Sequence, residues 1–183
     1  AGELAGASGK DLIVAAVLAY EVQCRMADAA SIRSCGWDHV CYGAFSAALA
    51  AGRLLGLSRE QLVHAQGLSA NGHMAMRQVR AGELSMWKGC SFANTSRNAM
   101  VAVLLAAEGM TGPAPIFEGE MGFFKQVSRK SFDLPKLGGC HRDGWVGSLA
   151  EHLDVVDVDQ TGEKVLGVRT GDRELRGRIT VNA

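Results

Sequence analysis

The sequence lacks a net charge, because its 19 lysine and arginine residues equal its 19 aspartate and glutamate residues. It therefore has no basic field that would attract nucleic acid and no acidic tail with a solvating role. Aromatic residues make up only 6% of the chain, which argues against base-stacking platforms. We expect no nucleic-acid partner.

Long apolar runs are also missing. The longest, residues 12–20, ends at Glu21 and is too short to span a bilayer or to act as a secretory signal, so no membrane partner is expected. The cysteines are odd in number and form no CxxC pair, which predicts reduced thiols and a cytoplasmic protein over a disulfide framework. They are Cys24, Cys35, Cys41, Cys90 and Cys140.

Common cofactor and metal motifs are absent from the sequence. It contains no dinucleotide fingerprint, no P-loop and no nucleophile elbow. No two histidines have the HxxH or HxxxH spacing of helical metal sites, so we predict no metal and no cofactor. The histidines are His39, His64, His73, His141 and His152.

What the sequence does contain is typical of closely packed helices. Its 183 residues suit one domain with a small appendage, and 48% of them are hydrophobic. The 23 glycines are scattered along the chain, and alanine is abundant in the first 110 residues. Small residues let helices approach closely, so we predict a mainly α fold.

Helix signals cover most of the first 110 residues. Ser8 with Asp11, and Ser58 with Gln61, form capping boxes whose helices run to about residues 33 and 69. Two further helices are expected over 42–55, before Gly56, and over 92–108. The polar stretch 71–89 between helices is too long for a plain turn, and it is a candidate functional loop.

The last third of the chain changes character. Residues 153–158, 164–169 and 175–181 alternate as strands do, and turn residues at 160–163 and 170–173 join them. We therefore predict a helical domain over residues 1–136 and a tail over 137–183 that holds a small C-terminal β meander.

Two residues stand out as candidates for catalysis. His39 lies at an expected helix entrance and can serve as a general base or bind a carboxylate, or it can simply cap the helix. Lys88 precedes the expected helix 92–108, where its ammonium and the helix N-terminus would meet the same anion. The alternative for Lys88 is an exposed lysine in a loop.

Other polar residues are weaker candidates. Arg77, Arg80 and Arg97 can each add bidentate carboxylate contacts, although each alone is more often a surface charge. His73 lies in the polar stretch and can face a ligand, whereas His64 falls within a helix and is expected to be structural.

Several segments stand in a distinctive order and spacing over about residues 6–137. They are Asp11-Leu12-Ile13-Val14-Ala15-Ala16, Ala19-Tyr20-Glu21-Val22, Gly36-Trp37-Asp38-His39, Leu54-Leu55-Gly56-Leu57-Ser58, Glu60-Gln61, Glu83-Leu84-Ser85-Met86-Trp87-Lys88, Ser96-Arg97-Asn98, Leu104-Leu105-Ala106-Ala107-Glu108-Gly109-Met110-Thr111-Gly112-Pro113, Phe117-Glu118-Gly119 and Gly122-Phe123. Together, these segments resemble the MmgE/PrpD family.

This resemblance implies a helical-domain fold and a lyase that acts on small polycarboxylates. Members resemble 2-methylcitrate dehydratase, cis-aconitate decarboxylase and iminodisuccinate epimerase, which move a proton next to a carboxylate without metal. His39 and Lys88 match the family's active-site histidine and lysine. They are expected to line one cleft, with Ser85 or Arg97 nearby and with Arg77 and His73 as further substrate contacts. The family also implies a homodimer.

The sequence departs from the family pattern in two places. The family's other site residues lie in segments upstream and downstream that are not found here, so the domain is expected to be incomplete on its own. The alternative is a non-catalytic remnant or interaction module that keeps the helical core.

Residues 164–170 and 179–183 resemble a strand pair of FAD-dependent amine oxidases, but without a dinucleotide fingerprint we predict no FAD. A truncated, fused or frame-altered family member fits both halves.

Overall fold

The chain divides into two compact units, Ala1–Pro135 and Lys136–Ala183, which are described separately. A computed structural model describes residues 1–133 of the first unit, and 154–158, 165–170 and 173–175 of the second. The first unit is helical, which confirms the mainly α prediction. Among the described residues, no helix is both long enough and apolar enough to cross a membrane.

Five α-helices and three short helical turns build the first unit. The α-helices are α1 (Gly2–Ala5), α2 (Gly9–Ala29), α3 (Val40–Leu54), α4 (Arg59–Gly72) and α5 (Trp87–Ala107). The turns are the 3₁₀-helices η1 (Arg33–Cys35) and η2 (Arg77–Arg80) and the π-helical turn η3 (Phe124–Ser128). Both predicted capping boxes are present at the starts of α2 and α4.

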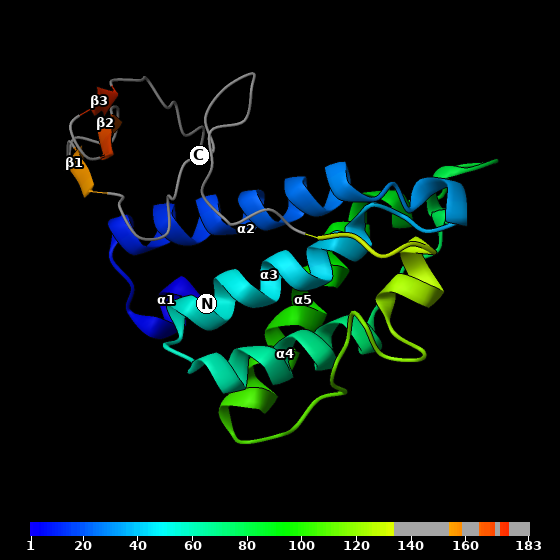
Figure 1. The fold of residues 1–183 in the computed structure, drawn as a ribbon. Helices are drawn as coiled ribbons and strands as arrows, with labels where there is room; N and C mark the ends of the chain where they lie inside the picture. The colour runs from blue at the N-terminus through cyan, green and yellow to red at the C-terminus, as the bar shows by residue number, and fades with distance from the viewer. Residues whose placement is uncertain (134–153, 159–164, 171–172, 176–183) are drawn as a thin grey trace. The chain divides into compact units, whose positions relative to one another are not determined.

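Helix α3 lies at the centre of the unit, where it packs against α2, α4 and α5 (Figure 1). Ala44 and Ala48 on α3 are fully buried, so these small residues pack inside the unit. At Gly43 a Cβ would come within 2.8 Å of the Phe92 ring on α5. Small side chains therefore set the spacing between α3 and α5.

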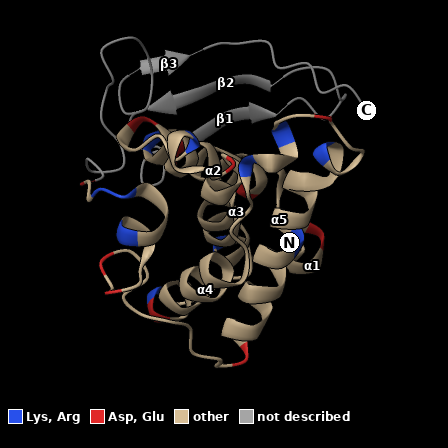
Figure 2. Cartoon of the chain, turned by 90° about the vertical axis from the view of Figure 1, so that its right-hand side faces the viewer, with Lys and Arg blue, Asp and Glu red and all other residues tan. Residues whose placement is uncertain are grey.

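An aromatic cluster closes the core. Phe45 on α3 stacks on Phe117 at 4.7 Å between ring centroids and meets Phe123 edge to face at 5.2 Å. These contacts hold the segment after α5 against α2 and α3, where Val22 and Met26 complete the buried cluster. The visible faces of α4 and α5 carry few charged residues (Figure 2).

Two helix boundaries differ from the predicted ones. Helix α2 ends at Ala29 because Ala30 is extended, and the Tyr42 hydroxyl donates to the Ala30 carbonyl while accepting the Ile32 N–H. Helix α5 begins at Trp87, five residues earlier than expected, and no side-chain cap marks this start. The end of α2 depends on a tertiary contact and the start of α5 carries no cap, so local sequence shows neither boundary.

The described strands of the second unit are β1 (Asp154–Val158), β2 (Val165–Thr170) and β3 (Arg173–Leu175). They pair antiparallel in the order β1-β2-β3. The first two begin within one residue of the predicted strands. The predicted turn 160–163 and most of the predicted third strand, 176–181, lie outside the described residues.

Candidate functional site

A short antiparallel bridge brings the segment before α3 beside the polar stretch after α4. The Asp38 N–H donates to the Ala75 carbonyl at 2.9 Å, and the Arg77 N–H donates to the Gly36 carbonyl at 2.8 Å. The bridge thus joins the segment that contains His39 to the polar stretch 71–89, which was predicted as a functional loop. It places η2 next to the start of α3, where His39 lies.

The buried side chain of Asp38 is the polar centre of this junction. Its Oδ2 accepts a hydrogen bond from Arg80 Nε at 2.6 Å, and its Oδ1 accepts the Val40 N–H at 3.1 Å. His39 Nδ1 also lies 3.2 Å from Asp38 Oδ1. One carboxylate therefore connects the first residue of α3, the imidazole before it and the last residue of η2.

His39 occupies the N-cap position of α3, which agrees with its predicted place at a helix entrance. Its side chain makes no capping hydrogen bond and is 55% exposed. The imidazole therefore forms no hydrogen bond with the first N–H groups of α3. It faces solvent and is accessible to a ligand, next to a buried carboxylate and a guanidinium.

A cavity of about 370 Å³ lies beside η2, with Gln78 and Val79 in its wall. It brings together two of the predicted substrate-binding residues, His73 at the end of α4 and Ser85 before α5. Neither His39 nor Lys88 is part of its wall. Its lining is His73, Ala75, Met76, Gln78, Val79, Glu83, Ser85, Trp87 and Ser91.

The His73 ring is fixed from both sides by α5. Its Nε2 lies 2.8 Å from the Thr95 hydroxyl, which also lies 3.2 Å from the Ser91 carbonyl, and its Nδ1 lies 2.9 Å from the Asn98 amide nitrogen. These contacts suit a neutral ring with its proton on Nε2. Burial, and secondly the charge of Arg97, lower the pKa of His73.

The three remaining predicted site residues carry positive charge. Lys88 is exposed in the first turn of α5, so it lies inside this helix and not before it. Arg97 is exposed two residues beyond Thr95, and Arg77 is half-buried as the first residue of η2. Among the described residues, none of the three forms an ion pair with a carboxylate.

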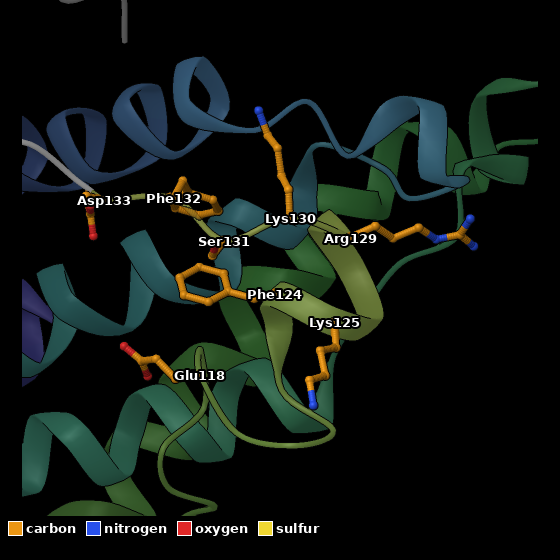
Figure 3. A pocket seen from close by; sticks show the side chains of 8 residues that line it. All are labelled: Glu118, Phe124, Lys125, Arg129, Lys130, Ser131, Phe132 and Asp133. Carbon is orange, nitrogen blue, oxygen red and sulfur yellow. The ribbon is translucent and has the colours of Figure 1, made fainter.

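A second cavity, of about 950 Å³, was not anticipated from the sequence (Figure 3). Lys125, Arg129 and Lys130 contribute three cations to its wall, but their side chains point in different directions. Such cations do not converge on one anion. The lining is completed by Glu118, Phe124, Ser131, Phe132 and Asp133.

Metal ligands and paired thiols do not gather in the described part of the chain. No group of three or more histidine, cysteine, aspartate or glutamate side chains there could hold a metal ion. The described cysteines, Cys24, Cys35, Cys41 and Cys90, are free. Burial raises the pKa of Cys41 to about 11, so this thiol is protonated at neutral pH.

Comparisons with known proteins agree with the resemblance seen in the sequence. Residues 1–135 match the family model of the MmgE/PrpD N-terminal domain. A cis-aconitate decarboxylase-like protein of Aspergillus oryzae, oryM, is 33% identical over 124 residues, which are 64% of this chain and 25% of that protein. The chain thus spans about a quarter of the length of this curated relative.

Proposed function

Because the chain belongs to the MmgE/PrpD family, we propose that it is the helical domain of a lyase that acts on small polycarboxylates. The reaction is the removal of a proton next to a carboxylate. The finer parts of the proposal are dehydration of 2-methylcitrate without metal, by a cytoplasmic homodimer. The printed name of the relative, a cis-aconitate decarboxylase-like protein, supports the same class of substrate.

The observation that carries the proposal is the junction at Asp38. It holds an accessible imidazole, His39, next to the guanidinium of Arg80. An imidazole is suited to proton transfer near neutral pH. Cations that hold substrate carboxylates also stabilise the charge that develops when the proton leaves. A base and a cation meet here, as this chemistry requires.

Lys88 is proposed as the second active-site residue. Its ammonium lies in the first turn of α5, where the dipole of the helix also favours an anion. Arg77 and Arg97 are proposed as further cations for the substrate. Ser85 would add a neutral hydrogen-bonding group from the smaller cavity. His73 would contact the substrate through its neutral ring, because Thr95 and Asn98 already hold both ring nitrogens.

Binding of citrate to the whole chain tests this proposal, with the dissociation constant measured by calorimetry. Lys88→Ala removes one charge-assisted contact, so we expect binding to weaken by about tenfold. The matched control is Lys125→Ala, which removes an exposed lysine from the cavity of Figure 3 and should leave the affinity unchanged.

The outcomes separate the competing readings. Unchanged affinity in Lys88→Ala, or an equal loss in Lys125→Ala, would show that citrate binds elsewhere. No binding of citrate, cis-aconitate or 2-methylcitrate by the unmodified chain would favour a non-catalytic module that keeps the helical core.

A further inference from the structure

Among the three arginines of the candidate site, the structure distinguishes Arg80. We propose that Arg80 is a substrate-binding residue that grips a carboxylate of the ligand beside His39, and that the buried Asp38 positions its guanidinium for this. The inference rests on the proposed function, because it names a further contact for the same polycarboxylate ligand.

The first step is the anchor of the guanidinium. Arg80 Nε donates to Asp38 Oδ2 at 2.6 Å, and the Asp38 side chain is completely buried. The other carboxylate oxygen is fixed by the Val40 N–H. Asp38 itself is held by the bridge to the Ala75 carbonyl. The guanidinium is therefore tied at its inner end to a rigid part of the fold.

The second step is the outer edge of the same group. A guanidinium has five N–H donors, and the anchor uses only the one on Nε. Within the described residues, Nη1 and Nη2 have no hydrogen-bond partner. Neither atom is among the buried polar atoms that lack a partner, so both are accessible to solvent. The Arg80 side chain keeps 23% of its surface exposed. This outer edge is thus open to a carboxylate, whose two oxygens it matches.

The third step is the comparison with the other two arginines. Arg97 is exposed, and its Nη2 lies 3.4 Å from the neighbouring Asn98 side chain. Arg77 has no carboxylate partner among the described residues. Of the three, Arg80 is the one that a buried carboxylate holds in place before a ligand arrives. Less rotamer freedom is then lost on binding, which favours affinity.

The fourth step is the position of the base. His39 Nδ1 lies 3.2 Å from the same Asp38 carboxylate that anchors Arg80. A ligand carboxylate on the outer edge of Arg80 is therefore held near the imidazole. The carbon next to that carboxylate is the one that must lose a proton in the proposed reaction.

The experiment compares Arg80→Lys with the unmodified full-length chain in citrate binding. Lysine keeps the positive charge, but its single ammonium cannot hold Asp38 and offer a planar fork at the same time. We expect the dissociation constant for citrate to rise by about tenfold. Arg59→Lys makes the same change at an exposed position in the first turn of α4 and should leave it unchanged.

A second measurement does not depend on any variant. Nitrogen NMR of the unmodified chain should show a slowly exchanging Arg80 Nε–H that is held by Asp38. Saturating citrate should then resolve the Nη signals of Arg80, because a bidentate contact slows rotation about the Cζ–Nη bonds. Nη signals that do not respond to bound citrate would overturn the inference even if Arg80→Lys fails to fold.

Failure of the inference differs from failure of the proposed function. If citrate binds and Lys88→Ala weakens it, but Arg80→Lys does not, only the role of Arg80 is wrong. If the unmodified chain binds no polycarboxylate, the proposed function and the role of Arg80 both fall. Equal losses in Arg80→Lys and Arg59→Lys would show that the loss does not depend on the guanidinium held by Asp38, and this too would overturn the inference.

Discussion

His73 shows how a single polar side chain can be set by its neighbours. Thr95 and Asn98 hold its two ring nitrogens, and Arg97 adds a positive charge nearby. Protonation of Nδ1 would break the hydrogen bond that this atom accepts from Asn98. It would also place a positive charge on the ring near the positive charge of Arg97. Both burial and this charge therefore act against the protonated form.

This leads to a prediction about acid sensitivity. The pKa of His73 in the folded state lies below its ordinary value of 6.5. Between the two values the unfolded chain binds more protons, so the free energy of unfolding rises with pH. The stabilising contribution of His73 is therefore complete above about pH 6.5 and is lost as the pH falls through the folded-state pKa. Proton NMR of the His73 ring should give a midpoint below 6.5.

Arg97→Gln provides the comparison for this titration. Removing the guanidinium should raise the pKa of His73 and make the melting temperature less sensitive to acid. Arg59→Gln removes an exposed charge at the opposite end of α4 from His73, so it should change neither the pKa of His73 nor the acid sensitivity of the melting temperature. A His73 midpoint at or above 6.5, or one that Arg97→Gln leaves in place, would contradict this account.

For single residues, the sequence predicted where a residue lies in a helix better than it predicted which distant residue it contacts. The place of His39 at the start of α3 follows from local signals, and the structure has it there. The pairing of Asp38 with Arg80 joins residues 42 positions apart, so local sequence could not reveal it. A hint was available, since an aspartate between Trp37 and Val40 is placed for burial and then needs a partner. Whether His39 and Lys88 share a cleft stays a prediction.

Among the elements, the packing of α4 against the chain after α5 depends on one glycine. Gly67 is buried where the chain after α5 crosses α4, and a Cβ there would lie 2.3 Å from the Pro113 carbonyl oxygen. His64 contributes to the same crossing, because its Nδ1 accepts the Gly112 N–H at 3.3 Å. His64 is therefore structural, as predicted, and the crossing tolerates no side chain at Gly67.

Gly67→Ala should lower the free energy of unfolding by about 1–3 kcal/mol, because backbone atoms must move to admit the methyl group. The matched control is Gly72→Ala at the end of the same helix, where nothing lies within 4 Å of the added Cβ. That change should be neutral or stabilise by up to about 1 kcal/mol. Urea unfolding of both variants measures the difference, and equal effects would refute the argument.

The elements that local chemistry specifies were the ones predicted most closely. The helices α2 and α4 begin at their capping boxes, where a serine and a residue three positions later satisfy the first N–H groups. Helix α5 has no such cap, and Lys88 and Gly89 in its first turn belong to the polar stretch 71–89 that was predicted as a loop. The short turns η1 and η2 were not predicted because they flank the bridge between two distant segments: η1 precedes Trp37, and η2 follows Met76.

For the whole molecule, the homodimer that the family resemblance implies needs an uncovered apolar surface. The small residues Ala44 and Ala48 of α3 cannot supply it, because they are buried within the unit. Apolar residues remain uncovered on the C-terminal half of α5, where Val101 is 50% exposed. Leu104 and Leu105 lie beside it and are 41% and 39% exposed. Uncovered apolar patches mark interaction surfaces.

We therefore predict that the chain forms a two-fold dimer through this part of α5, where each copy presents the same face to the other. Sedimentation should show a dimer at high micromolar concentration. Val101→Glu would bury a charge in the interface and should shift the chain to monomer. Val63→Glu on α4 changes an equally exposed valine and should leave the dimer intact. A monomeric unmodified chain, or dissociation in Val63→Glu as well, would show that α5 is not the interface.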